Sequence, residues 1–248
     1  MTLVSHRAHA ANLTIAEQDE MFDLFARYYQ PVDRGRFERD LSRKQWVIQL
    51  RHAETGKLCG FSTQVLVQAP ALGGVTHALF SGDTIVDPEH WNETALVREW
   101  GRLAMELRDE VAPEPLYWYL ISKGYRTYRF LPVFFREFYP RRDRETPGDV
   151  QEILDALGRQ LFCSGYDAQR GIVVGNPQKE RLRAGVADIT DARRQNADIR
   201  FFAEANPGHA EGDELCCLAR LDVENFTRAG IRLLDPKYRP GPVSSARC

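Results

Sequence analysis

Residues 75–122 read VTHALFSGDTIVDPEHWNETALVREWGRLAMELRDEVAPEPLYWYLIS, and this stretch decides the fold. Its first part, 75–86, is rich in the β-branched and aromatic residues that favour a strand. Asp87 is a good N-cap and Pro88 a good first helical residue, so we expect a long helix to start there. The apolar run 116–122 then predicts a strand that is buried on both faces.

The long helix is predicted to end near Val111, because Pro113 and Pro115 follow. Apolar residues recur at every third or fourth position and give this helix one apolar face. They are Leu96, Trp100, Leu103, Leu107 and Val111.

The residues before this stretch predict a helix and two further strands. Thr14-Ile-Ala-Glu17 is a capping box, in which the Thr hydroxyl and the Glu carboxylate cover free N–H groups. The helix that follows ends at Pro31. Strands at 45–52 and 57–68 then form an antiparallel meander with the strand at 75–86. Residues 1–13 are expected to be a flexible tail.

The residues after this stretch are more irregular. Residues 124–139 are dense in aromatic side chains and predict a helix that Pro132 kinks or divides. The other expected elements are helices at 150–161 and near 178–183 and strands at 171–174, 199–205 and 213–221. We therefore expect one domain over 14–235, an insertion at about 141–198, and a flexible tail over 236–248.

Composition excludes several classes of protein. The 248 residues are 43% hydrophobic and 27% charged, which is typical of a globular chain. A net charge of -2 gives no electrostatic reason to expect nucleic acid as a partner. No apolar run approaches the roughly 18 to 20 residues that a membrane span needs, and the N-terminus lacks the apolar core of a secretory signal. We expect a cytoplasmic protein.

The cysteines and histidines do not predict a metal site. None of the five cysteines forms a Cys-x-x-Cys pair, and the six histidines lack metal-ligand spacing. Cys216 and Cys217 are adjacent in an expected strand, so their side chains should point to opposite faces. Nucleophile-elbow, Walker and dinucleotide-binding motifs are also missing from the sequence.

The order of expected elements resembles the GCN5-related N-acetyltransferase (GNAT) superfamily. The clearest point is strand 75–86 running through Val86-Asp87-Pro88 into the long helix, where the family has Val-x-Pro, an Arg- and Gly-rich loop and a helix. The resemblance covers roughly residues 14–139, with 199–221 completing the sheet. It implies an α+β fold, with a mixed, mostly antiparallel central sheet flanked by helices, and an enzyme that moves an acyl group from a thioester to an amine.

The loop after the strand departs from the family pattern. The Arg/Gln-x-x-Gly-x-Gly/Ala signature is missing: Asn92 and Thr94 stand where glycines are expected, and Glu89 and Glu93 add negative charge. Three interpretations remain. The donor is an acyl group on the phosphopantetheine of an acyl carrier protein; or acyl-CoA binds with fewer loop contacts; or the fold has lost catalysis and binds a ligand or a protein partner.

The resemblance also implies which residues hold the thioester donor. Loop and helix N–H groups bind the pyrophosphate of acyl-CoA in the family. Ser122 is a candidate hydrogen-bond donor to the pantetheine or the acceptor, and Lys123 and Arg126 are candidate phosphate contacts. The complete expected donor-binding set is Ile85, Val86, Trp91, Asn92, Thr94, Ala95, Ser122 and Lys123.

Acyl transfer to an amine needs a base for the ammonium proton and can use an acid for the leaving thiolate. Asp83 is the candidate base, and on a regular strand it shares a face with His77. The alternative is that Gly82-Asp83 marks a bulge or a solvated edge. The candidate acid is Tyr139 by resemblance, with Tyr128 as the alternative; both are also explained as packing residues.

The aromatic residues over 117–139 have two interpretations. They fill the core, or they line a tunnel for a medium or long acyl chain, where each buried methylene contributes about 0.8 kcal/mol. The acceptor, a small-molecule or peptide amine, is not identified by the sequence. The insertion at 141–198 would shape the acceptor pocket, cover the tunnel or mediate a homodimer.

Overall fold

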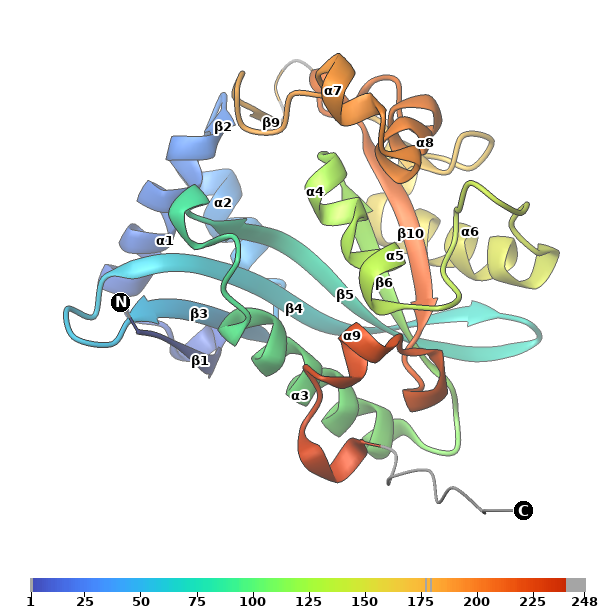
Figure 1. Ribbon diagram of the computed structural model, residues 1–248, viewed down its shortest axis with the longest axis horizontal. Helices are drawn as coiled ribbons and strands as arrows, with labels where there is room; N and C mark the ends of the chain where they lie inside the picture. Colours follow the sequence, from blue (N-terminus) through green and yellow to red (C-terminus); the bar gives the residue numbers. More distant parts are fainter. Residues whose placement is uncertain (1, 177, 179, 240–248) are drawn as a thin grey trace, which may run out of the picture.

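The structure is a computed structural model that describes residues 2–176, 178 and 180–239. An eight-stranded sheet with the order β1-β3-β4-β5-β6-β10-β8-β7 forms its centre (Figure 1). Its strands, in that order, are Leu3–His9, Trp46–His52, Leu58–Ala71, Gly74–Val86, Leu116–Ser122, Glu214–Arg220, Ile172–Val173 and Tyr166–Asp167. Neighbouring strands are antiparallel except β5 and β6, which are parallel. The expected mixed, mostly antiparallel sheet is confirmed.

Helices cover both faces of this sheet. They are α1 (Ile15–Tyr28), α2 (Arg34–Leu41), α3 (Ala95–Val111), α4 (Tyr125–Tyr128), α5 (Phe130–Phe134), α6 (Gly148–Phe162), α7 (Asp191–Arg194), α8 (Ala197–Ala205) and α9 (Arg228–Ile231). One face packs against α3, α4, α5 and α8. On the opposite face α1 and α2 cover the β3–β4 half, and α6 covers the half that contains β10.

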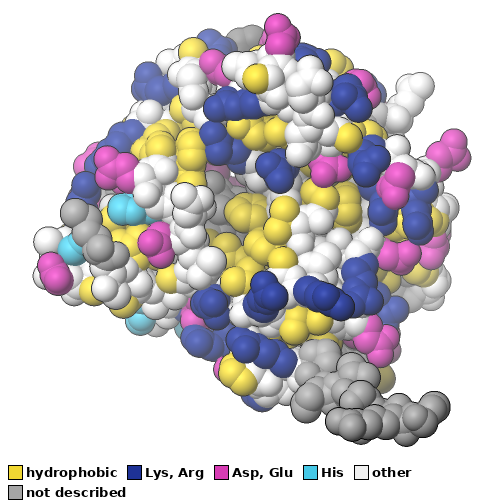
Figure 2. Space-filling view, in the orientation of Figure 1, with side chains coloured by type: hydrophobic (Ala, Val, Ile, Leu, Met, Phe, Trp, Pro, Cys, Tyr) yellow, Lys and Arg dark blue, Asp and Glu magenta, His cyan; other side chains and the backbone are white. Residues whose placement is uncertain are grey.

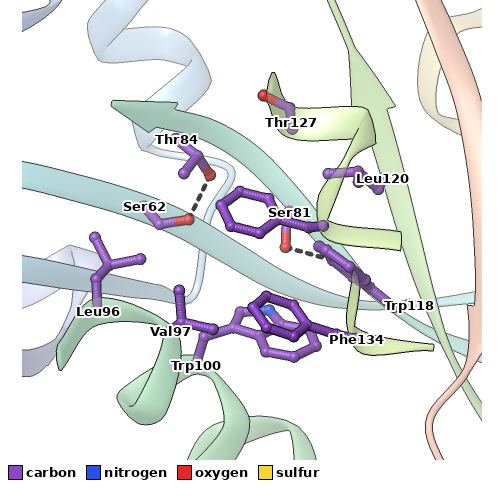
Figure 3. A pocket seen from close by; sticks show the side chains of 11 residues that line it. Ser62, Ser81, Thr84, Leu96, Val97, Trp100, Trp118, Leu120, Thr127 and Phe134 are labelled. Carbon is purple, nitrogen blue, oxygen red and sulfur yellow. Dashed lines mark hydrogen bonds between the residues drawn. The ribbon is translucent and has the colours of Figure 1, made fainter. Parts of the chain in front are cut away.

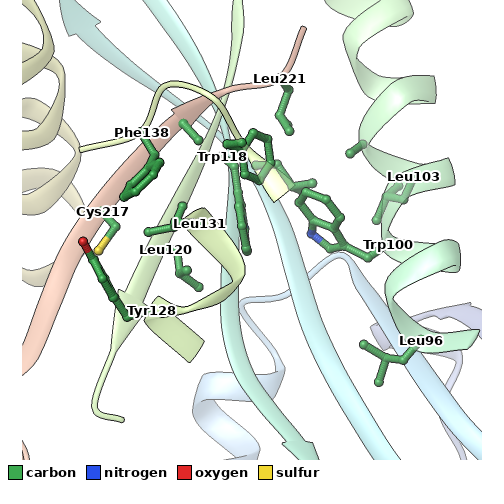
Figure 4. Close-up of a cluster of buried hydrophobic side chains, with 14 of the residues drawn as sticks. Leu96, Trp100, Leu103, Trp118, Leu120, Tyr128, Leu131, Phe138, Cys217 and Leu221 are labelled. Atoms are coloured by element: carbon green, nitrogen blue, oxygen red, sulfur yellow. The ribbon is translucent and has the colours of Figure 1, made fainter. Parts of the chain in front are cut away.

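The larger core lies between α3 and the sheet. Trp100 and Leu103 project from α3 toward Trp118 of β6 and Leu131 of α5 (Figure 4). The ring centroids of Trp100 and Trp118 are 4.6 Å apart. This packing explains the apolar stripe that the sequence places on the long helix, because a helix is stabilised mainly by burying such a stripe.

Local signals locate α1 and the meander correctly. The amide of Glu17 donates to Oγ1 of Thr14 at 3.2 Å, and the amide of Thr14 donates to Oε2 of Glu17 at 2.9 Å, so the predicted capping box is confirmed. The three predicted strands correspond to β3, β4 and β5, paired in sequence order. Cys216 and Cys217 point to opposite faces, as predicted, because they belong to different core clusters.

The N-terminal segment differs from the predicted tail. Residues Leu3–His9 form β1, which pairs antiparallel with β3 at the edge of the sheet. Arg7 Nη1 lies 2.7 Å from Glu106 Oε2 of α3, and Arg7 Nε lies 3.5 Å from Glu99 Oε1. Partners more than 30 residues away create this strand, and its own mixed polarity gives little sign of it.

Three other boundaries also differ. Residues 199–205, expected as a strand, lie in α8, where Ile199, Phe202 and Ala203 are buried at helical spacing. The helix expected near 178–183 is replaced by the two-residue strand β9 (Arg181–Leu182). Of the tail expected over 236–248, Pro236–Tyr238 form a short 3-10 turn, and 240–248 lie outside the described residues.

The long helix starts later than predicted. Pro88–His90 form a 3-10 turn, and α3 begins only at Ala95 with Thr94 as N-cap. Asp87 caps no helix; its carboxylate accepts a hydrogen bond from the Tyr28 hydroxyl. The loop between β5 and α3 is therefore longer than the sequence suggests. The predicted helix at 124–139 is likewise shorter and is divided at Arg129 into α4 and α5.

Candidate functional site

The parallel strands β5 and β6 part at their C-terminal ends. Their register runs from His77 opposite Leu116 to Ser81 opposite Leu120. Beyond Ser81, β5 continues to Val86 without β6 beside it, and Figure 1 shows the two strands diverging there. We call the space between the two strands beyond Ser81 and Leu120 the slot.

A β-bulge lies where the strands part. Ser62 of β4 pairs with Thr84 and Gln64 pairs with Ser81, so Gly82 and Asp83 together oppose Thr63. A Cβ on Gly82 would come within 2.7 Å of Thr63 Oγ1, so a side chain at this position would crowd β4. A bulge inserts one residue and re-aims the side chains that follow.

The bulge changes the face on which Asp83 lies. Without it, Asp83 would share a face with His77, as we predicted. The extra residue places it on the face of Phe80, where Lys44 is its neighbour. By strand alternation, His77 then lies on the opposite face. The alternative reading of Gly82-Asp83 as a bulge is confirmed, and the pairing of His77 with Asp83 is wrong.

Main-chain groups of β5 face the slot. The amide of Asp87 donates to the carbonyl of Cys59 on β4 at 2.8 Å. Alternation along β5 therefore turns the N–H and C=O groups of Thr84 and Val86 toward the slot. The Val86 carbonyl accepts a hydrogen bond from Trp91 Nε1 at 2.9 Å. Ile85, an expected donor contact, faces β4 instead, and its side chain is buried against α1 and α2.

An apolar pocket adjoins the slot on the α3 face. It contains about 410 Å³ of space not filled by atoms, including the solvent at its mouth. Leu96, Val97 and Trp100 of α3 face Phe134 of α5 across it (Figure 3). The pocket is also lined by Ser62, Ser81, Thr84, Trp118, Leu120, Thr127 and Phe130. Figure 2 shows the hydrophobic side chains gathered at the centre of this face.

The polar groups on the floor of this pocket are hydrogen-bonded to one another. Trp118 Nε1 donates to Ser81 Oγ at 2.8 Å, and Ser81 donates to Gln64 Oε1 at 2.5 Å. Gln64 Nε2 donates to Ser62 Oγ at 2.7 Å, which lies 2.7 Å from Thr84 Oγ1. Because buried polar groups are costly without partners, this chain of bonds lets an otherwise apolar pocket contain them.

The loop before α3 lies beside the pocket and bears on the donor-binding prediction. Trp91, Asn92 and Thr94 are exposed, and Ala95 is the first residue of α3. Thr94 makes no side-chain cap to the first turn of the helix. The Arg126 guanidinium lies 3.6 Å from the centroid of the Trp91 ring, and Arg98 Nε donates to Thr94 Oγ1 at 3.2 Å. Arginines from α3 and α4 therefore stand near the helix start, which lacks the family's glycines.

Asp83 lies on the other side of the slot, between the α1–α2 half and the α6 half of the sheet. Among the described residues, its carboxylate has no hydrogen-bond or ion-pair partner within the usual distances. Burial, followed by the negative charge of Asp40, raises the pKa of Asp83 to about 7, although Lys123 and Lys44 act in the opposite direction. A carboxyl with such a pKa is suited to accept a proton near neutral pH.

Lys123 also lies on the Asp83 side, which corrects its predicted role. Its Nζ is 3.3 Å from Glu214 Oε1 and 5.5 Å from the centroid of the Tyr29 ring. Burial alone would lower the pKa of Lys123, but the charges of Glu214, Tyr29 and Asp83 outweigh it and raise the pKa. Lys123 is therefore an ion-paired cation beside Asp83, away from the pocket where the donor was expected.

Ser122 ends β6 and is fully buried. Its carbonyl accepts a hydrogen bond from Asn206 Nδ2 at 3.3 Å, and its hydroxyl has no partner among the described residues. The contact of Ser122 with the pantetheine or the acceptor therefore stays a prediction.

The two candidate acids lie away from the slot. Tyr139 is bridged to Leu218 of β10, so β10 and β6 stand between it and β5. Tyr128 is 1% exposed, and its hydroxyl donates to the Pro140 carbonyl at 3.0 Å (its ring is drawn in Figure 4). Both rings pack in or beside the core. Neither hydroxyl is placed to protonate a thiolate in the slot.

Some aromatic residues at 117–139 line the pocket, and most fill the core. Trp118, Phe130 and Phe134 line the pocket. Most of the others are buried in the core with no contact to the pocket, among them Tyr119, Tyr125, Tyr128, Phe135 and Phe138.

Sequence reasoning missed Tyr29, Lys44 and Glu214, which surround Asp83 and Lys123. Lys44 Nζ lies 2.7 Å from Asp40 Oδ2 and over the Phe80 ring. Lys44 and Glu214 stand at the start of predicted strands, which is a weak local signal. Only the strand order brings them together.

No protein-family model and no curated protein matches the sequence. Among solved structures, the chain is similar to a conserved protein of unknown function from Enterococcus faecalis, described as a probable N-acyltransferase. The identity is 22% and the TM-score 0.40, and the match covers 56% of this chain and 33% of that chain. A Trypanosoma brucei acetyltransferase matches at 16% identity and a TM-score of 0.38, over 59% of this chain and all of that one. Saccharomyces cerevisiae N-myristoyltransferase with bound myristoyl-CoA matches at 13% identity and a TM-score of 0.36, over 50% of this chain and 30% of that one.

The match thus spans about a third of the E. faecalis chain and of the yeast enzyme. The chain's own topology identifies the fold as GNAT-like: an antiparallel meander, a bulged β5, the helix α3 and a parallel β6 that parts from β5. Over the described part of the chain, no helix is long and apolar enough to cross a membrane. The same residues contain no group of three or more His, Cys, Asp or Glu side chains arranged to hold a metal ion.

Proposed function

We propose that the chain transfers an acyl group from a thioester of CoA to a primary amine. The observation that carries this proposal is the slot between β5 and β6, with an apolar pocket on one side and the unpartnered carboxyl of Asp83 on the other. A thioester lying in the slot would present its carbonyl carbon between the two.

The donor side supplies main-chain and apolar contacts. The main-chain groups of Thr84 and the amide of Val86, which face the slot, would pair with the amides of a pantetheine arm, whereas the Val86 carbonyl already accepts from Trp91 Nε1. The pocket between α3 and α5 would take the acyl chain, where each methylene contributes about 0.8 kcal/mol. This favours a donor longer than acetyl. Exposed Arg98 and half-buried Arg126 would meet the phosphates near the first turn of α3, where free N–H groups favour anions.

The acceptor side supplies the base. An amine enters as an ammonium ion and loses one proton to Asp83, directly or through a water molecule. The free amine attacks the thioester carbonyl, the new C–N bond forms, and the C–S bond breaks. The nitrogen loses a second proton to solvent and the thiolate takes one proton from solvent, so the products are an amide and the free thiol of CoA. Asp83 then releases its own proton to solvent.

The first test measures a panel of donors with the native protein and with the variant Asp83→Asn. Release of free thiol and formation of amide are measured with acetyl-, octanoyl- and myristoyl-CoA, with the same acyl groups on a carrier protein, and with a mixture of primary amines. We expect octanoyl- or myristoyl-CoA to be used best. Asp83→Asn should lower kcat by about 100-fold or more, as expected for loss of a general base.

A matched pair of variants tests the pocket. Val97→Trp fills the space between α3 and α5 and should abolish binding of the acyl-CoA donor. Val133→Trp places the same side chain on an exposed position of α5 outside the pocket lining and should leave binding unchanged. Preference for the carrier-protein donor would revise the donor. If no thioester binds, the chain is a non-catalytic ligand- or protein-binding member of this fold and the proposal fails.

A further inference from the structure

A short segment of the region 141–198 crosses the open end of the slot. Its strand β9 pairs antiparallel with β2 (Tyr29–Gln30), at the end of α1. The amide of Arg183 donates to the Tyr28 carbonyl at 2.8 Å, and Arg183 Nη1 donates to Gln30 Oε1 at 3.1 Å. In Figure 1, β2 and β9 lie above the gap between β5 and β6. We call residues 180–187 the strap.

The strap also touches the β6 side of the slot. A Cβ on Gly124, the residue after Lys123, would lie 3.1 Å from Leu182 Cδ1 and 3.2 Å from Ala187 Cβ. The strap is therefore in contact with both walls: with the end of α1 through β2, and with the end of β6 through Gly124. The strap thus spans from the end of α1 to the end of β6 on the Asp83 side of the sheet, and we call the space beneath it the compartment.

Three ion pairs lie in and around this compartment. Lys44 bonds Asp40 at 2.7 Å, Lys123 bonds Glu214 at 3.3 Å, and Arg36 Nη1 lies 3.3 Å from Glu180 Oε1. Glu180 belongs to the strap, and its charge acts on both Lys123 and Tyr29. Of these groups only the Asp83 carboxylate has no partner among the described residues.

The remaining groups near Asp83 are aromatic. The ring of Phe80 lies on the same face of β5 and under the Lys44 ammonium, at 5.3 Å. The ring of Tyr29 stacks on Phe25 at 4.5 Å and faces Lys123. A single amine can therefore be matched by Asp83. A second charge on the same molecule would be buried without a partner or would have to break an existing ion pair, and both are costly.

We propose that the acceptor is a small primary amine whose remainder carries no charge, held beneath the strap with its nitrogen at Asp83. The inference rests on the proposed function, because it assigns the amine to the Asp83 side of the slot. It names a substrate class: alkylamines and arylalkylamines fit it, and free amino acids, diamines and peptides do not.

Two matched pairs of amines test the charge argument. 2-Phenylethylamine and phenylalanine differ by one carboxylate, and butylamine and 1,4-diaminobutane differ by one ammonium group. With octanoyl-CoA as donor, we expect kcat/KM to be at least about tenfold higher for the first member of each pair, because an unmatched charge in such a compartment is unfavourable. Equal or better use of phenylalanine, diaminobutane or a peptide N-terminus would overturn the inference.

Two glycine variants test the strap. Gly124→Ala pushes a methyl group against Leu182 and Ala187 and should raise KM for 2-phenylethylamine several-fold, with KM for the donor unchanged. Gly148→Ala, at the start of α6, adds the same methyl group where no atom lies within 4 Å, and should change neither constant. An unchanged KM for the amine in folded Gly124→Ala would show that the strap does not shape the acceptor site.

A binding measurement separates failure of this inference from failure of the proposed function. Calorimetry without donor should show 2-phenylethylamine binding and phenylalanine not binding, and Gly124→Ala weakening the former. If acyl-CoA neither binds nor reacts but this pattern holds, the transferase proposal fails and the amine compartment stands. If acyl transfer occurs but the calorimetric pattern is missing, the inference fails alone.

Discussion

Replacing Asp83 by Asn should change the pH dependence of folding stability in a predictable direction. The Asn side chain keeps the shape of the carboxyl and cannot ionise. In the native protein, burial and the nearby Asp40 raise the pKa of Asp83 from 3.8 to about 7, against the opposing effect of Lys123 and Lys44. The folded state thus holds the Asp83 proton more tightly than the unfolded chain does.

The sign and size of the effect follow from this difference. The stability that protonated Asp83 contributes is fully present below pH 3.8 and is lost as the pH rises through about 7. Between pH 5 and the pKa there are two pH units, each worth about 1.4 kcal/mol, so ionisation should cost the native protein about 3 kcal/mol by pH 8.5. Asp83→Asn avoids this cost. Its free energy of unfolding relative to the native protein should rise by about 2 to 3 kcal/mol from pH 5 to pH 8.5.

Urea unfolding followed by circular dichroism at pH 5.0 and pH 8.5 measures this change. Asp23→Asn is the matched control, because Asp23 is an exposed carboxylate on α1, and it should give a similar difference from the native protein at both pH values. A constant difference for Asp83→Asn across the pH range would show that Asp83 is ordinarily solvated. The structural basis for its role as a base would then be lost.

Three further predictions concern the site and its surroundings. The acyl-transfer rate of the native protein should rise through a step near pH 7, as Asp83 loses its proton; the charged and titratable groups around it are Asp40, Lys44, Lys123, Glu214 and Tyr29. This step should be missing from the pH–rate profile of Asp83→Asn. A step that persists in the variant would count against Asp83 as the base. Gly82→Ala should lower the free energy of unfolding by about 1 to 3 kcal/mol in urea titrations, because its methyl group would lie 2.7 Å from Thr63 Oγ1, whereas Gly148→Ala should be nearly neutral. Tyr139→Phe should keep kcat within about twofold of the native value in the thiol-release assay, since its ring lies beyond β10; a loss of 100-fold would reinstate it as the acid.

Much of the fold follows from short-range patterns. The capping box at Thr14 and Glu17, the alternation in β3 to β5 and the stripe on α3 are each complete within one segment. β1 could not be found in this way, because its strand character depends on β3, which is distant in the sequence. In α8, the seven residues IRFFAEA contain too few apolar positions to separate a period of 2 from a period of 3.6.

The candidate site was less predictable than the fold. Asp83 was identified because it ends a strand of a recognisable topology. Its surroundings are Tyr29, Lys44, Lys123 and Glu214, four residues spread over nearly 200 positions of the chain. The face on which Asp83 lies depends on a bulge, and the sequence GDT predicts a bulge and a regular strand equally well.

The extra residue at Gly82-Asp83 shifts the phase of β5. Side chains before it keep one odd–even assignment of inside and outside, and side chains after it keep the reverse. If the same residues paired with β4 in regular alternation, without a bulge, Asp83 would lie on the α3 face, beside the proposed acyl-chain pocket. The face of the sheet that carries the proposed base therefore depends on one extra residue in β5, without any change in the kinds of side chain present.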